Sequence, residues 1–170
     1  RPLVVMSPKS LIRHPLAVSP SEDFYEGAFQ PVISAEGTDP ERVERHLFCG
    51  GKVYYDIMQT LRKQEGLAER IAVTRVEQFY PFPEEEIAAE LERYRNAHTV
   101  VWVQEESANM GAWSFLRHRL DAALERLHGP CGRRLAYAGR AASASTATGS
   151  AKVHQQQQDA LVHEALGLEA

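Results

Sequence analysis

Apolar positions along most of this chain follow two alternating patterns, which predict strands that alternate with helices. Compact apolar stretches are typical of buried strands, and they cover residues 3–6, 45–49, 71–79, 99–103 and 134–137. Apolar residues at helical spacing indicate amphipathic helices, and they cover residues 53–61, 84–94, 113–127 and 153–166. Strands joined by helices favour a mostly parallel sheet with helices on both faces.

Residues 14–40 interrupt this regular pattern. Prolines and glycines recur through the segment, so we expect a long irregular excursion. Its apolar side chains, among them Phe24, Tyr25 and Phe29, predict that the excursion packs onto the body. We expect residues 1–170 to form a single domain. Because the chain begins with Arg1 and continues at once as a predicted strand, we also expect it to be a fragment of a longer chain.

Composition narrows the class of protein. The 170 residues are 44% hydrophobic and 25% charged, as in ordinary globular proteins. The formal net charge of −4 argues against nucleic acid or a membrane surface as a partner. No apolar run approaches the roughly 20 residues of a membrane span, so we expect the cytoplasm or, in a eukaryote, the mitochondrial matrix. Cys49 and Cys131 lie far apart, and we interpret both as incidental or buried thiols.

Several motifs that would indicate an active site are missing from the sequence. It has no GxGxxG, no GxxxxGK[ST], no HExxH and no thiamine diphosphate signature. We therefore expect no catalytic residue, no bound cofactor and no metal site within this chain.

Two groups of residues are candidates for binding an anion. Lys9, Ser10 and Arg13 follow the first predicted strand, at the sheet edge where ligands bind in open α/β folds. Arg140 and Ser143 begin the loop of small residues after the last predicted strand. Arginine and lysine can hold phosphate groups there. The alternative for the first group is a solvated basic turn, or an ion pair to another domain.

A third group follows the strand at residues 99–103. Glu105 and Glu106 are paired carboxylates, which can act as general acid and base because their repulsion raises one pKa. A subunit contact is the favoured alternative, since Met110 and Trp113 are good interface anchors and Asn109 lies beside them. That reading predicts an exposed apolar patch around Met110 and Trp113.

Five motifs occur in a recognisable order over nearly the whole chain. They are LVVMSPKSL at 3–11, GKVYYD at 51–56, EQFYPFP at 77–83, QEESANMGAW at 104–113, and the stretch 137–158. In this order they resemble the C-terminal domain of the E1 component of 2-oxoglutarate dehydrogenase. Ser107, Ala141 and Thr146 stand where that family usually has proline.

The resemblance implies a transketolase-like C-terminal domain, a three-layer α/β/α sandwich with a mostly parallel five-stranded sheet. It implies an enzyme that decarboxylates 2-oxoglutarate in the tricarboxylic acid cycle and passes the succinyl group to the lipoyl arm of E2. Thiamine diphosphate and Mg²⁺ are then bound outside this chain, which is inactive alone.

The implied partners are the upstream domains, a second subunit, E2 and E3. Acetyl-CoA or AMP is the implied effector, with Lys9 contacting its phosphate. Two alternatives remain: a free-standing nucleotide- or CoA-binding regulatory module, and the E1 of a 2-oxoadipate dehydrogenase.

Overall fold

The protein contains one five-stranded sheet between two layers of helices. The computed structural model describes residues 2–129 and 132–168. The strands are β1 (Val32–Ile33), β2 (Arg45–Cys49), β3 (Ile71–Val76), β4 (Thr99–Ser107) and β5 (Arg134–Arg140). The helices are α1 (Val53–Leu61), α2 (Glu84–Arg93), α3 (Trp113–His128) and α4 (Ala151–Leu166), with short 3₁₀ turns η1 (Lys9–Leu11), η2 (Ser21–Phe24) and η3 (Pro40–Arg42). The expected α/β fold is confirmed.

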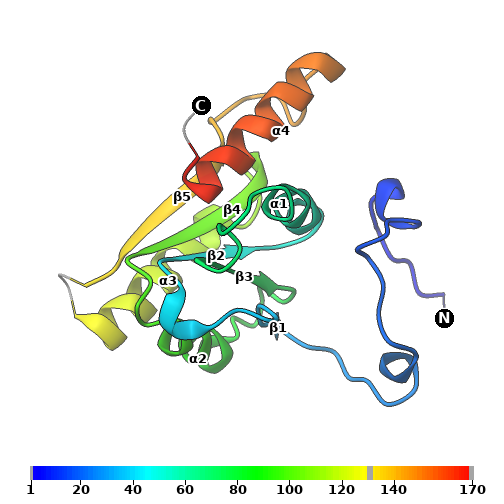
Figure 1. The fold of residues 1–170 in the computed structure, drawn as a ribbon. Helices are drawn as coiled ribbons and strands as arrows, with labels where there is room; N and C mark the ends of the chain where they lie inside the picture. Colours follow the sequence, from blue (N-terminus) through cyan, green and yellow to red (C-terminus); the bar gives the residue numbers. More distant parts are fainter. Residues whose placement is uncertain (1, 130–131, 169–170) are drawn as a thin grey trace.

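The order of the strands is β1-β3-β2-β4-β5 (Figure 1). β2 pairs in parallel with both β3 and β4, and β4 pairs in parallel with β5. Only β1 is antiparallel among the described strands, and it contributes two residue pairs at the edge beside β3. β2 and β4 therefore form the centre of the sheet, and the chain reverses its direction of winding between them.

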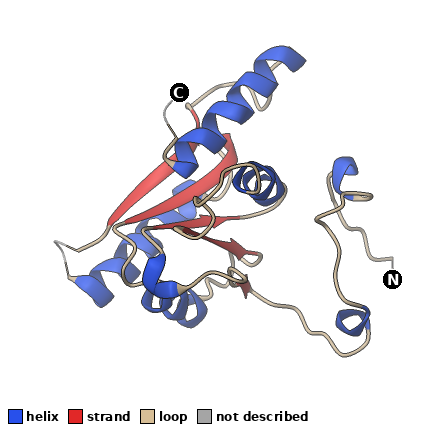
Figure 2. Cartoon of the chain, in the orientation of Figure 1, coloured by secondary structure: helices blue, strands red, loops and turns tan. Residues whose placement is uncertain are grey.

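Alternation along the central strands explains the two helical layers. Leu47 and Val101 face a core shared with α1 and α4, whereas Phe48 and Trp102 face a second core shared with α2 and α3. Successive side chains of a strand point to opposite faces, so each central strand supplies both cores. Figure 2 shows the strands enclosed between these helices. Burial on both faces is why residues 99–103 are almost continuously apolar.

The prediction of a buried strand at residues 3–6 is wrong. This stretch has no strand partner in the described structure, and Leu3 and Met6 are 88% and 92% exposed. Residues 2–30, here called the N-terminal arm, contain no buried side chain. The arm reaches the body at His14, whose Nε2 lies 2.6 Å from Nε2 of Gln59. Figure 1 shows most of the arm as an irregular segment that lies beside the body.

Within the excursion at residues 14–40, the segment from Pro31 onwards joins the sheet. The Pro31 carbonyl accepts hydrogen bonds from the amides of Glu77 and Gln78, and β1 then joins the sheet. Phe24, Tyr25 and Phe29 remain 68–81% exposed, so the expectation that these aromatic side chains pack onto the body is wrong. The described segment before Pro31 meets the body only near α1, where His14 contacts Gln59 and Tyr55, and the three aromatic side chains lie beyond that contact.

Candidate functional site

The carboxyl ends of β2 and β4 lie side by side at the point where the strand order reverses. In open α/β sheets this crevice is the usual ligand site. The turn after β2 consists of Gly50 and Gly51, and Gly51 has a φ of +72°. That left-handed conformation favours glycine, and it places Lys52 at the start of α1, opposite the end of β4.

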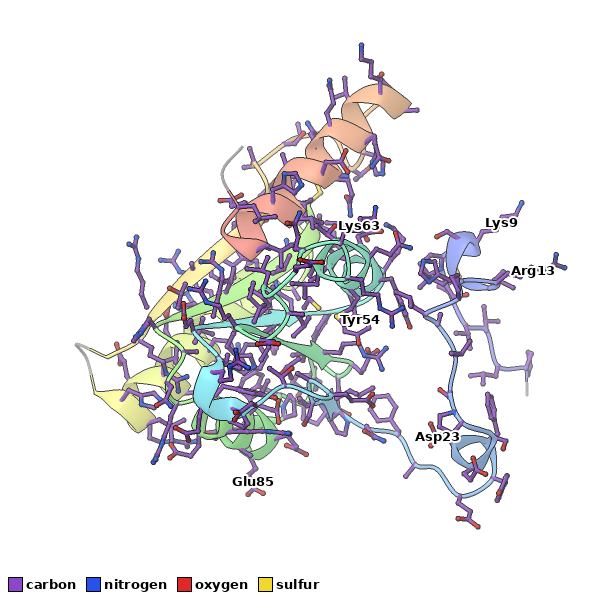
Figure 3. All side chains as sticks on the ribbon, viewed as in Figure 1. Lys9, Arg13, Asp23, Tyr54, Lys63 and Glu85 are labelled. Atoms are coloured by element: carbon purple, nitrogen blue, oxygen red, sulfur yellow. The ribbon has the colours of Figure 1, made fainter. Side chains whose placement is uncertain are left out.

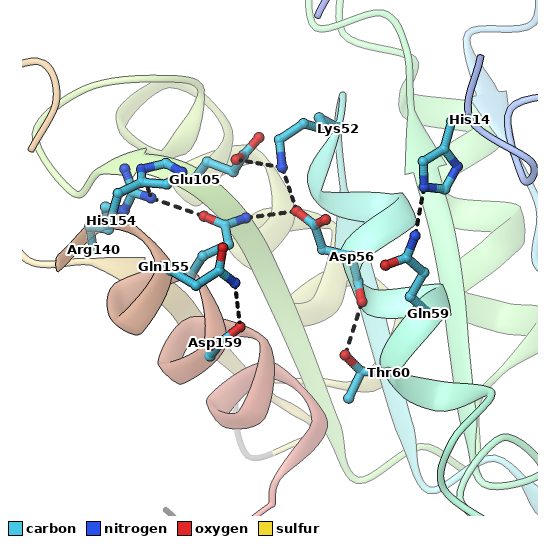
Figure 4. Close-up of polar contacts among 11 residues, drawn as sticks. His14, Lys52, Asp56, Gln59, Thr60, Glu105, Arg140, His154, Gln155 and Asp159 are labelled. Atoms are coloured by element: carbon cyan, nitrogen blue, oxygen red, sulfur yellow. Dashed lines mark hydrogen bonds and ion pairs between the residues drawn. The ribbon is translucent and has the colours of Figure 1, made fainter. Parts of the chain in front are cut away.

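Lys52 joins α1 to the end of β4. Its Nζ lies 2.6 Å from Oδ2 of Asp56 and 3.2 Å from Oε1 of Glu105 (Figure 4). Burial acts to lower the pKa of Lys52, but its hydrogen bond to Asp56 and the charge of Glu105 outweigh that effect and raise the pKa. Lys52 therefore stays protonated near neutral pH. Glu105 is thus engaged in an ion pair.

Gln158 continues this polar network onto α4. Its Nε2 donates to Oδ2 of Asp56 at 2.9 Å, and its Oε1 accepts from Nη2 of Arg140 at 2.9 Å. The same Nη2 lies 3.0 Å from Nδ1 of His154. Since a guanidinium can only donate, His154 Nδ1 is the acceptor. Figure 4 shows these groups as one chain of contacts from α1 through α4 to the end of β5.

Gln104 organises the turn between β4 and α3. Its Oε1 accepts hydrogen bonds from the Trp102 indole and the Trp113 amide, at 2.9 and 3.0 Å. Its Nε2 donates to the carbonyl of Met110 at 2.8 Å. Gly111 follows with a φ of +67°, and a Cβ there would lie 3.0 Å from the Gln104 amide. Gln104 was not predicted as a site residue, although a lone amide at the end of an apolar strand was a usable signal.

The predicted contact residues are only partly exposed. Glu106 and Asn109 are exposed, whereas Met110 and Trp113 are half-buried. Trp113 packs against Tyr137, with ring centroids 5.0 Å apart. The expected exposed apolar patch around Met110 and Trp113 is therefore not present in this form. The reason is that the amide of Gln104 draws this turn against the body.

The two predicted anion groups lie in different parts of the molecule. Lys9, Ser10 and Arg13 are exposed on the arm, and Figure 3 shows Lys9 and Arg13 pointing away from the body. Arg140 and Ser143 line a cavity of about 600 Å³ between the loop after β5 and α4. Arg140 and Ser143 therefore lie together at one cavity, whereas Lys9, Ser10 and Arg13 lie elsewhere, on the arm.

Lys52, Asp56 and Gln158 belong to the network but were missed in the sequence analysis. Lys52 and Asp56 carried a usable signal, because opposite charges four residues apart on a helix face one another. Gln158 carried none, since it is one of four consecutive glutamines and only the packing of α4 selects it.

A second polar cluster, centred on Glu90, lies mostly inside the body, and its outermost member, Ser34, lines a cavity beside α1. Thr74 donates from its hydroxyl to Oε2 of Glu90 at 2.7 Å, and Ser34 donates to Oε1 at 2.6 Å. His46 Nε2 lies 2.9 Å from the same Thr74 oxygen. Because the Thr74 proton is committed to Glu90, Nε2 of His46 is the donor. Burial lowers the pKa of His46 to about 3, so its ring is neutral.

No three His, Cys, Asp or Glu side chains within residues 2–129 and 132–168 are arranged to hold a metal ion. Over the same residues, no helix is long and apolar enough to cross a membrane. Cys49 is fully buried at the end of β2, and Cys131 lies outside the described residues.

Comparison with known proteins shows which family the chain resembles. Residues 18–166 match the family model described as 2-oxoglutarate dehydrogenase C-terminal. The chain is 43% identical to the 2-oxoglutarate dehydrogenase E1 component of Exiguobacterium sp. over 98% of its own length and 17% of that protein. It is 44% identical to the E1 component of Haemophilus influenzae, over 98% of the chain and 17% of that protein. It is also 44% identical to mitochondrial 2-oxoglutarate dehydrogenase of Caenorhabditis briggsae, over 99% of the chain and 16% of that protein.

The fold has a relative among solved structures. A split-gene transketolase, described as an inactive β4 tetramer, aligns with a TM-score of 0.52 at 17% identity, over 84% of this chain and 44% of that one. This likeness concerns the fold alone. The chain thus spans about one sixth of the length of its curated relatives and matches a C-terminal family model over most of its own length. The chain therefore belongs to the 2-oxoglutarate dehydrogenase C-terminal family.

Proposed function

We propose that this chain serves as the C-terminal domain of a 2-oxoglutarate dehydrogenase E1 component. That enzyme oxidatively decarboxylates 2-oxoglutarate in the tricarboxylic acid cycle and transfers the succinyl group to the lipoyl arm of E2, with E3 completing the complex. The observation that carries the proposal is the 43–44% identity to E1 components across 98% of this chain. The location follows the relatives, either the bacterial cytoplasm or the mitochondrial matrix.

Thiamine diphosphate and Mg²⁺ belong to the proposed enzyme but do not fit the residues of this chain. The described residues offer no cluster of metal ligands, and the polar network at the sheet edge is already paired internally, from Lys52 to His154. We therefore assign both cofactors to other parts of E1 and derive no decarboxylation step from this chain.

The role that we assign to the domain itself is assembly. The N-terminal arm exposes a series of large apolar side chains, and an exposed apolar surface of this kind is typical of a contact site. We infer that upstream domains or the second subunit of a homodimer cover the arm. Glu106 and Asn109, exposed at the end of β4, extend the proposed contact surface, with Glu105, Met110 and Trp113 beneath it.

Effector binding on the arm is the second part of the proposal. Lys9, Ser10 and Arg13 are exposed, and none of the ion pairs in the described chain involves Lys9 or Arg13. Free cationic groups beside a hydroxyl suit the phosphates of acetyl-CoA or AMP.

The test compares the 170-residue chain with a complete E1 that contains it. NADH formation from 2-oxoglutarate, with E2, E3, CoA and NAD⁺ supplied, is expected only for the complete E1. Met6→Glu is expected to reduce the dimer fraction of the complete E1, measured by sedimentation velocity. Val153→Glu, on α4 and 41% exposed, is the control and is expected to leave the dimer intact. An active isolated chain, or an unaffected Met6→Glu dimer, contradicts the proposal.

The alternatives give different results in the same experiment. The E1 of a 2-oxoadipate dehydrogenase is expected to show a higher kcat/KM with 2-oxoadipate than with 2-oxoglutarate. A free-standing regulatory module is expected to bind acetyl-CoA or AMP as the isolated chain, and to lose that binding in Lys9→Ala, without supporting any E1 activity.

A further inference from the structure

The cavity between the loop after β5 and α4 has an unusual charge distribution. Arg140 and Glu164 are the charged residues in its lining. Glu164 interacts with the charge of Arg45, whose Nη2 also donates to the Glu164 carbonyl at 3.2 Å. The guanidinium of Arg140, in contrast, is bonded to Gln158 and His154, which are both neutral acceptors. No ion pair within residues 2–129 and 132–168 involves Arg140.

Unsatisfied polar atoms gather at the same cavity. Arg140 Nε, Thr148 Oγ1 and Gln157 Oε1 are buried without a hydrogen-bond partner, and all three residues line the cavity. Buried polar atoms without partners are rare in native proteins, because each loses its hydrogen bonds to water without gaining others. Arg140 Nε can donate a hydrogen bond, Gln157 Oε1 can accept one, and the Thr148 hydroxyl can do both. A ligand that satisfies them therefore combines oxygen acceptors with a hydroxyl or amide donor.

The loop at residues 141–149 is the part of the cavity wall that can move. None of its residues is buried. It is attached to the body through Asn109, whose side chain accepts from the Ser143 amide and donates to the Ser143 carbonyl, both at 3.0 Å. A segment with few buried contacts opens at low free-energy cost. Opening of this loop would expose the three atoms that are sealed from solvent when it is closed.

We propose that this cavity binds a small ligand that carries a phosphate or carboxylate group. The anionic group pairs with Arg140, the Thr148 hydroxyl and Gln157 Oε1 bond to the rest of the ligand, and the loop closes over it. The site is separate from the effector site proposed on the N-terminal arm, and it does not depend on the proposed function of the enzyme.

The proposed site has a consequence for the network in Figure 4. Gln158 connects Arg140 to Asp56, which is bonded in turn to Lys52. An anion on Arg140 offsets the guanidinium charge that Gln158 faces, and the ligand adds contacts to α4 through Gln157. We therefore expect the bound ligand to protect both the loop and α4 from exchange with solvent.

The test uses inorganic phosphate and succinate as probes, in separate titrations at constant ionic strength. The complete E1 and the 170-residue chain are titrated in parallel by calorimetry, and amide hydrogen exchange is followed in residues 141–166. Saturating probe is expected to slow exchange in the loop and in α4. The probe that binds more tightly identifies the anionic group as phosphate or carboxylate.

Three variants decide the assignment. Arg140→Gln is expected to raise the Kd by about tenfold or more, because it removes a charge-assisted hydrogen bond. Thr148→Val keeps the shape of the side chain and is expected to raise the Kd by about threefold to tenfold. Arg134→Gln is the matched control at the opposite, exposed end of β5, and it is expected to leave the Kd unchanged.

Each outcome has a defined meaning. Protection of the loop that is lost in Arg140→Gln supports the site, in either protein. Should Arg140→Gln also destabilise α4, weaker binding by Thr148→Val in a normally folded chain supports the site instead. Binding that is lost in Lys9→Ala but unchanged in Arg140→Gln assigns the anion to the arm and overturns this proposal. No protection by either probe in either protein also overturns it.

Discussion

The buried ring of His46 makes the stability of the fold depend on pH in a way that can be calculated. Burial, followed by the charges of Arg133 and Arg93, lowers the pKa of His46 to about 3 in the folded state, against about 6.5 in an unfolded chain. Between these two values the unfolded chain binds a proton that the folded chain does not bind. The free energy of unfolding therefore falls as the pH decreases through this range, and the contribution of His46 is complete above about pH 6.5.

The size of the effect follows from the difference in pKa. Each pH unit corresponds to about 1.4 kcal/mol, so protonation of His46 accounts for a loss of up to about 5 kcal/mol between pH 6.5 and pH 3. His46 has no exposed surface, so solvent screening does not reduce this figure. Such a loss is a large fraction of the stability of a typical domain.

The assay is guanidinium chloride unfolding at a series of pH values from 7.5 to 4.5, followed by tryptophan fluorescence, with Trp102 buried in the core. His46→Phe removes the titrating ring, and His46→Gln is a second variant that keeps a hydrogen-bonding group near Thr74. Between pH 5.5 and 4.5 the wild type is expected to lose about 1 kcal/mol per pH unit more than either variant. Parallel pH profiles for the wild type and both variants would show that the His46 ring does not cause the pH dependence.

Three further predictions concern single side chains. Gln104→Leu is expected to lower the unfolding free energy by about 3 kcal/mol in chemical denaturation, because the buried Trp102 indole and the half-buried Trp113 amide lose their acceptor. A loss below about 1 kcal/mol argues against this role. Gly111→Ala is expected to lower the unfolding free energy by about 1–2 kcal/mol in the same denaturation assay, because of the positive φ and the close Gln104 amide. The control Gly149→Ala, with open space around it, is expected to leave the unfolding free energy nearly unchanged. Burial raises the pKa of the Cys49 thiol to about 12, so iodoacetamide at pH 8 is expected to label Cys49 only in urea, as read by peptide mass spectrometry; rapid labelling of the folded chain contradicts its burial.

Strands and helices of the body were predictable because burial imposes a period on the sequence. Residues 99–103 are apolar since both faces of β4 meet helices, and that requirement is visible without the structure. β4 continues to Ser107, beyond the predicted end, because Ser107 pairs with Arg140 of β5 after an irregularity in the register that follows Val103. β1 was missed because two residues are too few to establish any period.

The apolar run at residues 3–6 shows the opposite limit. Its apolar composition indicates that the run is buried, but it does not indicate which surface buries it. No described part of this chain covers the run. The same limit applied to the candidate site. Arg140 and Ser143 were predictable as a local pair in one loop, whereas the path from Lys52 to Gln158 depends on helices that are far apart in the sequence.

The arrangement of the sheet also governs how the chain acquires its structure. β2 lies between β3 and β4, and each of these parallel pairings encloses at least one helix, so none can form as a local hairpin. Non-local pairings of this kind slow folding, because the connecting segment must be ordered before the contacts form. During synthesis, the edge of β2 that pairs with β4 therefore stays unpaired until β4 has left the ribosome. The link from Asp56 to Gln158 can form only once α4, which follows all five strands in the chain, has been synthesised.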